Sequence, residues 1–187
     1  ATHYPLLATF SVLPPMNQIS FITANFVARQ LGYHMPHGWG QGDAATQAWF
    51  SPIGTFEARF DEMLGEITAL GFTSIDLWSA HLHFLWATPE HIAIAKRLLA
   101  KRSLRIESYA GGFGDTLPEF RAACRLCTEL KIPVLGGGTG LLASDRAGLV
   151  ATLREFGLVF ALENHPEKTP AELLAKLGTG DEDVIGV

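Results

Sequence analysis

The sequence has few of the features that membrane, secreted or nucleic-acid-binding proteins need. Among its 187 residues there are only two cysteines, and no apolar run approaches the roughly 18 residues of a membrane-spanning helix. Fourteen lysines and arginines stand against 19 aspartates and glutamates, so the net charge of -5 offers no basic surface for nucleic acid or an anionic membrane. Residues 1–15 lack the basic start of a secretory signal peptide. These absences predict a cytoplasmic protein whose partners include neither nucleic acid nor membrane.

The two cysteines, Cys124 and Cys127, are three residues apart within a helical pattern and therefore face the same way. Because no second pair is found elsewhere, a buried helix face is favoured over a zinc site. The composition suits a reducing, cytoplasmic setting.

The chain is rich in apolar segments that alternate between strand-like and helix-like periodicity. With 48% hydrophobic and 18% charged residues, its length suits one globular domain with a sizeable core. Strands are expected at 19–26, 73–79, 104–110, 132–135, 158–162 and 183–187. Helices are expected at 55–70, with Thr55 as N-cap, and at 88–99, 116–131, 144–156 and 169–177. This order predicts an α/β fold with parallel strands and right-handed crossovers, as in a (β/α)8 TIM barrel.

Two stretches fall outside this alternation. Residues 1–15 form no clear element and are expected to be an N-terminal extension packed on the outside of a barrel domain that spans 16–187. The connection 27–54, which holds Trp39 and Trp49, is long enough to be a functional lid, and packing of its aromatics on the barrel rim is an equal alternative.

The last predicted strand, 183–187, is still apolar where the sequence stops. Six strands and five helices are recognisable, whereas a closed barrel needs eight of each. An end at Val187 would leave a buried sheet edge unpaired, so we expect that roughly two further strand–helix units follow. If they are absent, another copy of the chain should cover the edge in a homo-oligomer. The predicted fold is thus an incomplete barrel with about six of eight strands.

The stretch 158–170 contains the main candidate for an active site. Five apolar residues lead directly into Glu163, Asn164 and His165, at the carboxyl end of a strand predicted to be buried on both faces. Ligands bind at the carboxyl ends of parallel strands, and a carboxylate there is costly unless it is paired or holds a metal. A functional role is therefore favoured over capping of the next helix or pairing with a neighbouring strand.

A second group of candidate side chains follows the strand at 73–79. Trp78 lies near its end, and His81 and His83 are two residues apart, so that on an extended backbone they would point the same way. Imidazoles there could act as acid–base groups or bind a polar ligand, although one of the two is expected to be structural. His91, in the first turn of a helix, is expected to be solvated.

A glycine-rich run, Gly136–Gly140, follows the strand at 132–135. Its backbone N–H groups could cradle a phosphate before a helix. However, Leu141 occupies the third glycine position of the dinucleotide fingerprint, and no Walker lysine follows. A tight turn at the barrel mouth that leaves room for substrate is therefore favoured.

Two motifs together resemble the xylose isomerase-like TIM-barrel superfamily: Glu163-Asn164-His165 after strand five, and Gly-Phe-Thr-Ser-Ile-Asp-Leu-Trp at 71–78 in strand two. The resemblance covers about residues 17–187. Members include sugar isomerases, sugar 3-epimerases, inosose-processing enzymes and apurinic endonucleases. The endonucleases carry His ligands at the ends of strands three and four, where this sequence has none, so a sugar, sugar phosphate or cyclic polyol is the implied substrate.

In this superfamily a glutamate at the end of strand five binds a divalent metal and often serves as one of two catalytic carboxylates, a position that Glu163 matches. The implied cofactor is Mn²⁺, Mg²⁺, Co²⁺ or Zn²⁺, and its other ligands would lie beyond Val187. The implied activity is isomerisation or epimerisation by proton abstraction alpha to a carbonyl, through an enediolate. His165 is expected to assist catalysis. The residues expected to bind substrate are Trp78, His81, His83 and Asn164.

Two alternatives use the same scaffold. One is a barrel that binds a sugar without transforming it, and the other is a metal-dependent dehydratase or hydrolase. An Asp soon after Val187, followed by a His and a Glu at strand ends, would favour the enzyme over the binding module.

Overall fold

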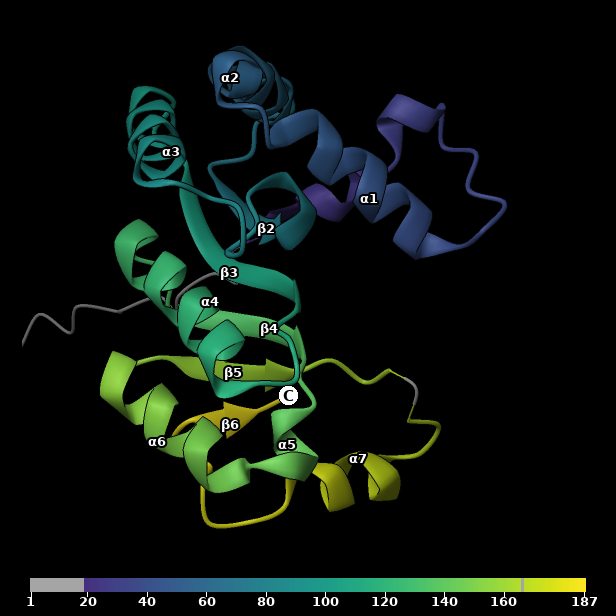
Figure 1. Ribbon diagram of the computed structural model, residues 1–187, viewed down its shortest axis with the longest axis vertical. Coiled ribbons are helices and arrows are strands. Elements are labelled where there is room, and N and C mark those ends of the chain that lie inside the picture. Colours follow the sequence, from purple (N-terminus) through teal and green to yellow (C-terminus); the bar gives the residue numbers. More distant parts are fainter. Residues whose placement is uncertain (1–18, 166) are drawn as a thin grey trace, which may run out of the picture.

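A computed structural model of the chain describes residues 19–165 and 167–187 (Figure 1). Six parallel strands form one sheet in sequence order. The strands are β1 (Phe21–Ile22), β2 (Ser74–Trp78), β3 (Arg105–Gly112), β4 (Val134–Gly138), β5 (Val159–Leu162) and β6 (Ile185–Gly186). The predicted alternation of strand and helix is confirmed. The predicted extension 1–15 and the domain start at Met16 lie outside the described residues.

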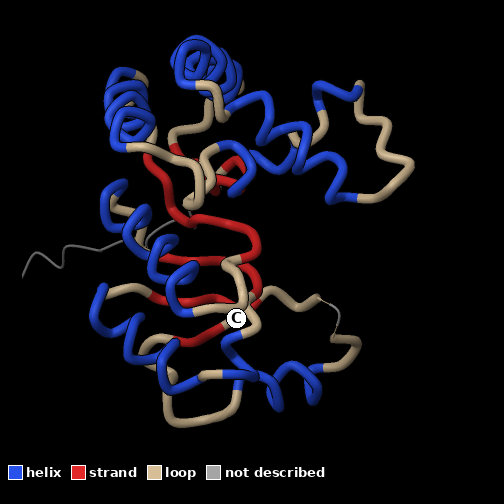
Figure 2. The backbone as a smooth tube through the Cα atoms, in the orientation of Figure 1, coloured by secondary structure: helices blue, strands red, loops and turns tan. Residues whose placement is uncertain are grey.

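Most helices lie along one side of the curved sheet (Figures 1 and 2). The α-helices are α1 (Trp39–Phe50), α2 (Ile53–Ala69), α3 (Pro89–Lys101), α4 (Leu117–Leu130), α5 (Leu141–Ser144), α6 (Arg146–Phe156) and α7 (Pro170–Leu177). Three short 3-10 helices are η1 (Thr23–Phe26), η2 (Arg29–Leu31) and η3 (Ser79–His81). Within 19–165 and 167–187, no helix combines the length and apolar character needed to cross a membrane.

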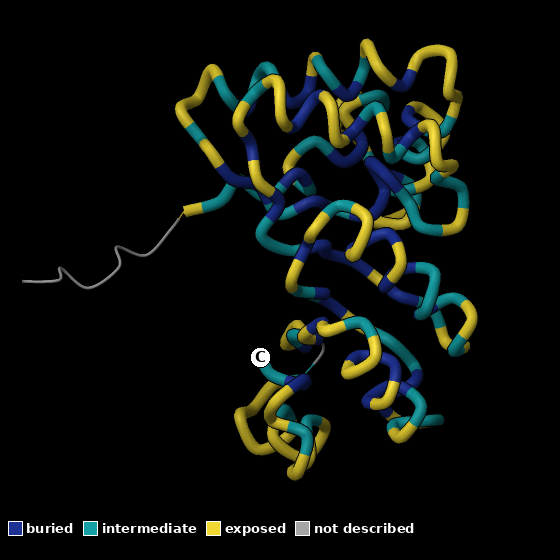
Figure 3. The backbone as a smooth tube through the Cα atoms, turned by 90° about the vertical axis from the view of Figure 1, so that its left-hand side faces the viewer, coloured by how far each residue is buried: buried dark blue, intermediate teal, exposed yellow. Residues whose placement is uncertain are grey.

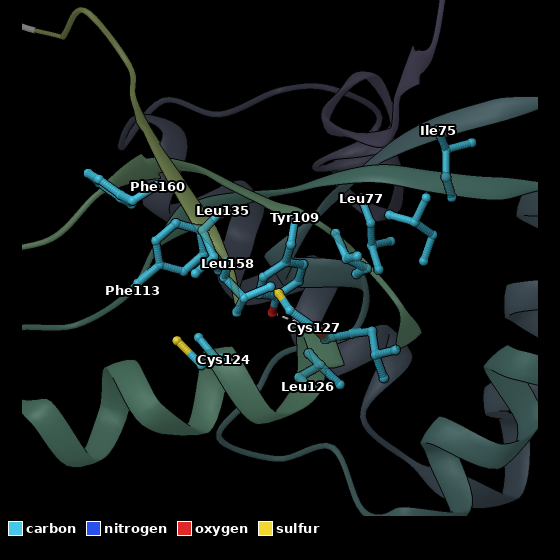
Figure 4. Packing of buried hydrophobic residues seen from close by; sticks show 14 of the residues in the cluster. Ile75, Leu77, Tyr109, Phe113, Cys124, Leu126, Cys127, Leu135, Leu158 and Phe160 are labelled. Atoms are coloured by element: carbon cyan, nitrogen blue, oxygen red, sulfur yellow. Dashed lines mark hydrogen bonds between the residues drawn. The ribbon is translucent and has the colours of Figure 1, made fainter. Parts of the chain in front are cut away.

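The core fills the space between the sheet and its covering helices. Outward-facing strand residues such as Leu77, Tyr109 and Phe160 are fully buried there (Figure 4). Cys124 and Cys127 are free and buried on the sheet-facing side of α4, as predicted. In Figure 3 the helices alternate between buried and exposed backbone, as amphipathic helices do.

The opposite, inner face of the sheet is open in this chain. Along β5 the buried residues Phe160 and Leu162 alternate with Ala161, which is partly exposed, and Val159, which is 39% exposed. The apolar run at 158–162 predicted a strand buried on both faces. This prediction is wrong, because β5 is buried on one face only. Burial on one face leaves room for a ligand on the other.

Several helices begin where the sequence predicted, each at a residue whose side chain caps the helix N-terminus. Thr88, Thr116, Asp145 and Thr169 each accept a hydrogen bond from the backbone N–H three residues on. The predicted cap Thr55 is wrong, because α2 begins at Ile53 after Pro52 and the Thr55 hydroxyl donates to the Pro52 carbonyl oxygen at 3.2 Å. Solvation of His91 is also wrong: it is 2% exposed, and its side chain completes the Thr88 capping box.

The segment 27–54 is largely helical rather than an irregular lid. Helix α1 buries Gly42, Thr46 and Phe50 at intervals of four residues. A Cβ at Gly42 would lie 2.8 Å from a Val27 methyl carbon, so only glycine allows this close approach. The aromatic residues of this segment thus come to the barrel rim on a docked helix.

Candidate functional site

All six strands end at the same edge of the sheet because they are parallel. Hydrogen-bonded register places Trp78 of β2 opposite Ala110, then Gly136 and Ala161 in the next two strands. The Glu163 N–H donates to the Gly137 carbonyl oxygen at 3.1 Å, which extends the ladder by one residue beyond β5. Alternation along β5 therefore puts Glu163 on the inner face with Ala161.

Trp78 is held from two directions. Its backbone N–H donates to the Thr23 hydroxyl at 2.8 Å, and its indole Nε1–H donates to Asp43 Oδ1 at 2.7 Å. The ring of Trp39 meets it edge-on, with centroids 5.9 Å apart. Burial raises the pKa of the Asp43 carboxyl, and hydrogen bonds from the Trp78 and Trp39 indoles oppose that rise. The rim at β2 is therefore a fixed, half-exposed aromatic surface.

His81 is fully buried behind this surface. Its Nδ1 lies 3.4 Å from both the Thr23 hydroxyl and the Trp78 carbonyl oxygen, and its ring packs edge-on against Phe50. Its Nε2 is buried without a hydrogen-bond partner among the described residues. Burial lowers the pKa of His81 to about 4, which keeps the ring neutral at pH 7. His81 supports Trp78 from inside rather than facing solvent.

His83 lies half-buried on the loop after η3. Because residues 79–81 form a 3-10 turn, the extended backbone that would have aligned His81 with His83 is not present. The Leu85 N–H donates to His83 Nδ1 at 3.2 Å, and the His83 ring stacks on Phe84. Burial also lowers the pKa of His83. The Tyr109 hydroxyl donates to the Leu82 carbonyl oxygen, which ties this loop to the buried outer face of β3.

Glu163, Asn164 and His165 are all exposed at the end of β5. The His165 N–H donates to the Glu163 carbonyl oxygen at 2.9 Å, and this bond between residues two apart bends the chain at Asn164. The extended backbone that would have put His165 beside Glu163 therefore ends here. Glu163 was selected from the sequence because burying an unpaired carboxylate is costly. In the structure Glu163 is exposed and does not pay this cost.

The inner face between Trp78 and Glu163 is floored by residues that have little or no side chain. The strands β3 and β4 contribute Gly112, Gly136 and Gly138, and a Cβ built on any of these would meet nothing within 4 Å. β5 contributes the partly exposed Ala161. Trp78 and Glu163 thus flank an open, shallow surface that spans three strand spacings, about 14 Å along the sheet.

The glycine run is strand rather than turn for its first three residues, because β4 extends to Gly138. Two N–H groups of the following loop are already used: that of Gly140 donates to the Gly114 carbonyl oxygen, and that of Leu141 donates to the Thr139 hydroxyl. A phosphate cradle in this loop is therefore not favoured. The glycines leave room above the sheet, as the favoured interpretation required.

A divalent ion would find one carboxylate ligand here. Glu163 presents an exposed carboxylate on the inner face, and hard oxygen donors suit Mg²⁺ or Mn²⁺. Within 19–165 and 167–187, however, no group of three His, Cys, Asp or Glu side chains lies close enough to hold an ion. The described residues fit a metal through Glu163 alone and do not assemble a complete site.

Sequence reasoning missed Asp43 and gave the rim position of Trp39 only as one of two equal alternatives. Both lie in the segment 27–54, where glycines obscured the helical periodicity. The usable signal was their spacing of four residues, which places an aromatic and a carboxylate on one side of a helix.

No protein-family model and no curated protein matches the sequence. Among solved structures, the chain is similar to a xylose isomerase-like TIM barrel protein from Mycobacterium smegmatis in complex with magnesium. That match has 18% identity and a TM-score of 0.56 and covers 90% of this chain and 63% of that one. A structure of D-psicose 3-epimerase in the presence of D-fructose matches with 17% identity and a TM-score of 0.45, over 67% of this chain and 54% of that one. The first of these matches shows that the chain forms part of a TIM-barrel fold. The chain spans less than two thirds of either structure's length.

Proposed function

We propose that the protein is an isomerase or epimerase of a sugar, sugar phosphate or cyclic polyol that works with a divalent metal ion. The observation that carries this proposal is the inner face of the sheet, where Glu163 and Trp78 flank a floor of glycine and alanine. Such a surface accepts a flat, hydroxyl-rich ligand and presents a carboxylate to one end of it. Carboxylates are suitable bases for carbon acids once a ligand excludes water around them.

Glu163 is proposed to remove the proton alpha to the substrate carbonyl. The C–H electron pair forms the enediolate C=C bond, and the carbonyl oxygen takes the charge. Return of the proton to the neighbouring carbon, with transfer of the hydroxyl proton to the former carbonyl oxygen, completes an isomerisation. Return to the opposite face gives an epimer and requires a second acid, which the superfamily resemblance assigns to a later strand. A divalent ion held by Glu163, when bound, would polarise the carbonyl and acidify this C–H bond.

The other predicted site residues receive supporting roles. Asn164 and His165 are exposed beside Glu163 and are available to donate hydrogen bonds to substrate hydroxyls. Trp78 forms the wall at the far side of the floor. His81 acts through Trp78, because it is buried behind it, and His83 lines the loop outside that wall.

The test is solvent deuterium exchange at the carbon alpha to the carbonyl, measured on the full-length protein with Mn²⁺ or Mg²⁺ added. Glu163→Gln preserves the side-chain volume and removes the charge, so exchange should stop while the fold is kept. Glu129→Gln, an exposed glutamate of α4 on the outside, is the matched control and should exchange like the wild type. Wild-type exchange in Glu163→Gln would remove Glu163 from the chemistry.

A second substitution tests the floor. Gly138→Leu fills open space above β4 and should block sugar binding without loss of stability. A barrel that binds sugars on this floor without transforming them is the alternative. That alternative expects Gly138→Leu to abolish binding and the wild type to show no exchange at all.

A further inference from the structure

Helix α1 places the carboxylate of Asp43 beside the indole rings of Trp78 and Trp39 at the end of β2. Asp43 Oδ1 accepts the Trp78 indole N–H at 2.7 Å, and Asp43 also interacts with the Trp39 indole one turn earlier on the same helix. No ion pair of Asp43 with a lysine, arginine or histidine occurs among residues 19–165 and 167–187. The half-buried carboxylate is thus directed at indole N–H groups instead of a cation.

The helix that carries Asp43 is firmly docked. Its buried face consists of Gly42, Thr46 and Phe50, and the Thr46 hydroxyl accepts the Ala28 N–H at 3.1 Å. Asp43 follows Gly42, the point of closest approach to the segment below, so its position is set by the packing of the helix. A hydrogen bond to an ionised acceptor is roughly twice as strong as a neutral one, and here it joins two rigid elements.

Packing alone does not account for this arrangement. Trp78 is only partly buried and Trp39 is 48% exposed, so the pair contributes little to the core that surrounds Leu77. The two rings stand nearly perpendicular, with an interplanar angle of 87°, and they lie at the end of the strand that borders the glycine floor. A fixed, exposed aromatic corner beside open space suits the apolar C–H face of a ring-shaped ligand.

We propose that Asp43 is a positioning residue that holds the indole of Trp78, so that Trp78 and Trp39 form an aromatic platform on which one face of a sugar or cyclic polyol ring stacks against one indole while the other indole contacts the edge of the ring. The inference rests on the proposed function and adds to it the residues that orient the ring. A ring stacked at this platform extends its hydroxyl groups over the glycine floor toward Glu163. Ligands with an unbroken C–H face are favoured over linear polyols.

The role of Asp43 in holding the Trp78 indole is tested on full-length protein labelled with 15N-tryptophan. Asp43→Ala should speed hydrogen exchange of the Trp78 indole N–H and raise the Kd for D-fructose or myo-inositol about fivefold, since a stacked aromatic contact of roughly 1 kcal/mol is lost. Asp43→Asn retains an acceptor oxygen and should restore most of both properties. In deuterium exchange assays, Asp43→Ala should raise KM and leave kcat nearly unchanged, because Glu163 is untouched.

The platform is tested by a matched pair on the same helix. Trp39→Ala should weaken sugar binding, whereas Trp49→Ala should not, because Trp49 is similarly exposed but packs under the Arg59 guanidinium. If Asp43→Ala and Trp39→Ala both bind sugar as tightly as the wild type does, the platform is overturned and the proposed function stands. A wild-type protein that binds neither sugar nor polyol would overturn both the proposed function and the platform, even if the Trp78 indole loses its protection in Asp43→Ala.

Discussion

The carboxyl ends of β2 and β5 face the same open surface but are built in opposite ways. At β2, Trp78 is fixed by hydrogen bonds from its backbone and its ring, and His81 is sealed behind it. At β5, Glu163 and the two residues after it are exposed, and backbone hydrogen bonds of Glu163 and His165 order the chain there. One end is rigid and aromatic, while the other is polar and free.

This difference fits the division of labour proposed above between Trp78 and Glu163. A wall that orients a ring gains from rigidity, because a preorganised surface loses less entropy when the ligand binds. The carboxylate proposed to meet a substrate and an ion has to be free of partners within the protein, and Glu163 makes no side-chain hydrogen bond or ion pair among the described residues. The four substitutions or conditions below test this comparison, starting with the sheet that joins the two ends.

The largest effect is expected at Gly137, midway between the two ends in β4. Its φ is +148°, and a Cβ there would collide with the Gly111 carbonyl oxygen of the adjacent strand. Gly137→Ala should lower the free energy of unfolding by about 3 kcal/mol or more. The neighbouring Gly138→Ala should change it by less than about 0.5 kcal/mol, because its Cβ meets open space. Urea denaturation measures the free energy of unfolding of both variants. Equal losses would contradict the assignment of Gly137 to the packed face of β4 and of Gly138 to its open face.

The next effect is the acid sensitivity of the β2 end. Folding lowers the pKa of His81 from 6.5 to about 4, so between these values the unfolded chain binds a proton that the folded chain does not. The stabilisation is complete above pH 6.5 and is lost as the pH falls toward 4, by roughly 3 kcal/mol from this group. Urea denaturation at several pH values should show this slope, and His81→Asn, which does not titrate, should flatten it. An unchanged slope in His81→Asn would assign the acid sensitivity to other groups.

A smaller effect is expected at Thr23, whose hydroxyl accepts the Trp78 backbone N–H at 2.8 Å while fully buried. Thr23→Val leaves that N–H unpaired in the interior and should cost about 2 kcal/mol. Thr23→Ser keeps the hydroxyl and is the control, with a smaller loss from the missing methyl group. If Thr23→Val and Thr23→Ser are equally stable, Trp78 is not anchored from this side.

Most of the sheet could be predicted from the sequence because strand and helix periodicities are strong there. The helix starts expected at residues 88 and 116 coincide with the observed N-caps Thr88 and Thr116. Helix α1 was missed because its buried positions are glycine, threonine and phenylalanine, which give no continuous apolar stripe. The open inner face was missed for a different reason: a strand of small apolar residues has the same pattern whether both faces are covered or one is free.

The candidate site was predicted by residue type but not by environment. Glu163 and Trp78 could be selected because polar and aromatic residues at strand ends are typical of ligand sites. The burial of His81 depends on Phe50 and Thr23, which are far from it in sequence, so no local pattern could reveal it. The partner of Trp78, Asp43, is likewise 35 residues away and on a helix that was not expected.

The smallest effect on stability is expected at Glu163, and it distinguishes function from capping. The carboxylate is exposed and makes no side-chain hydrogen bond or ion pair among the described residues, so Glu163→Gln should change the free energy of unfolding by less than about 0.5 kcal/mol. In urea denaturation at pH 7 without metal, a loss above 1 kcal/mol, on the order of a lost cap, would mean that Glu163 stabilises the start of the next segment. With Mn²⁺ present, the wild type should become more stable than Glu163→Gln, because an ion bound only to the folded state adds its binding free energy. If the Glu163 carboxylate does not affect the free energy of unfolding without metal but raises it when Mn²⁺ is present, its role is to bind a ligand and not to cap a helix.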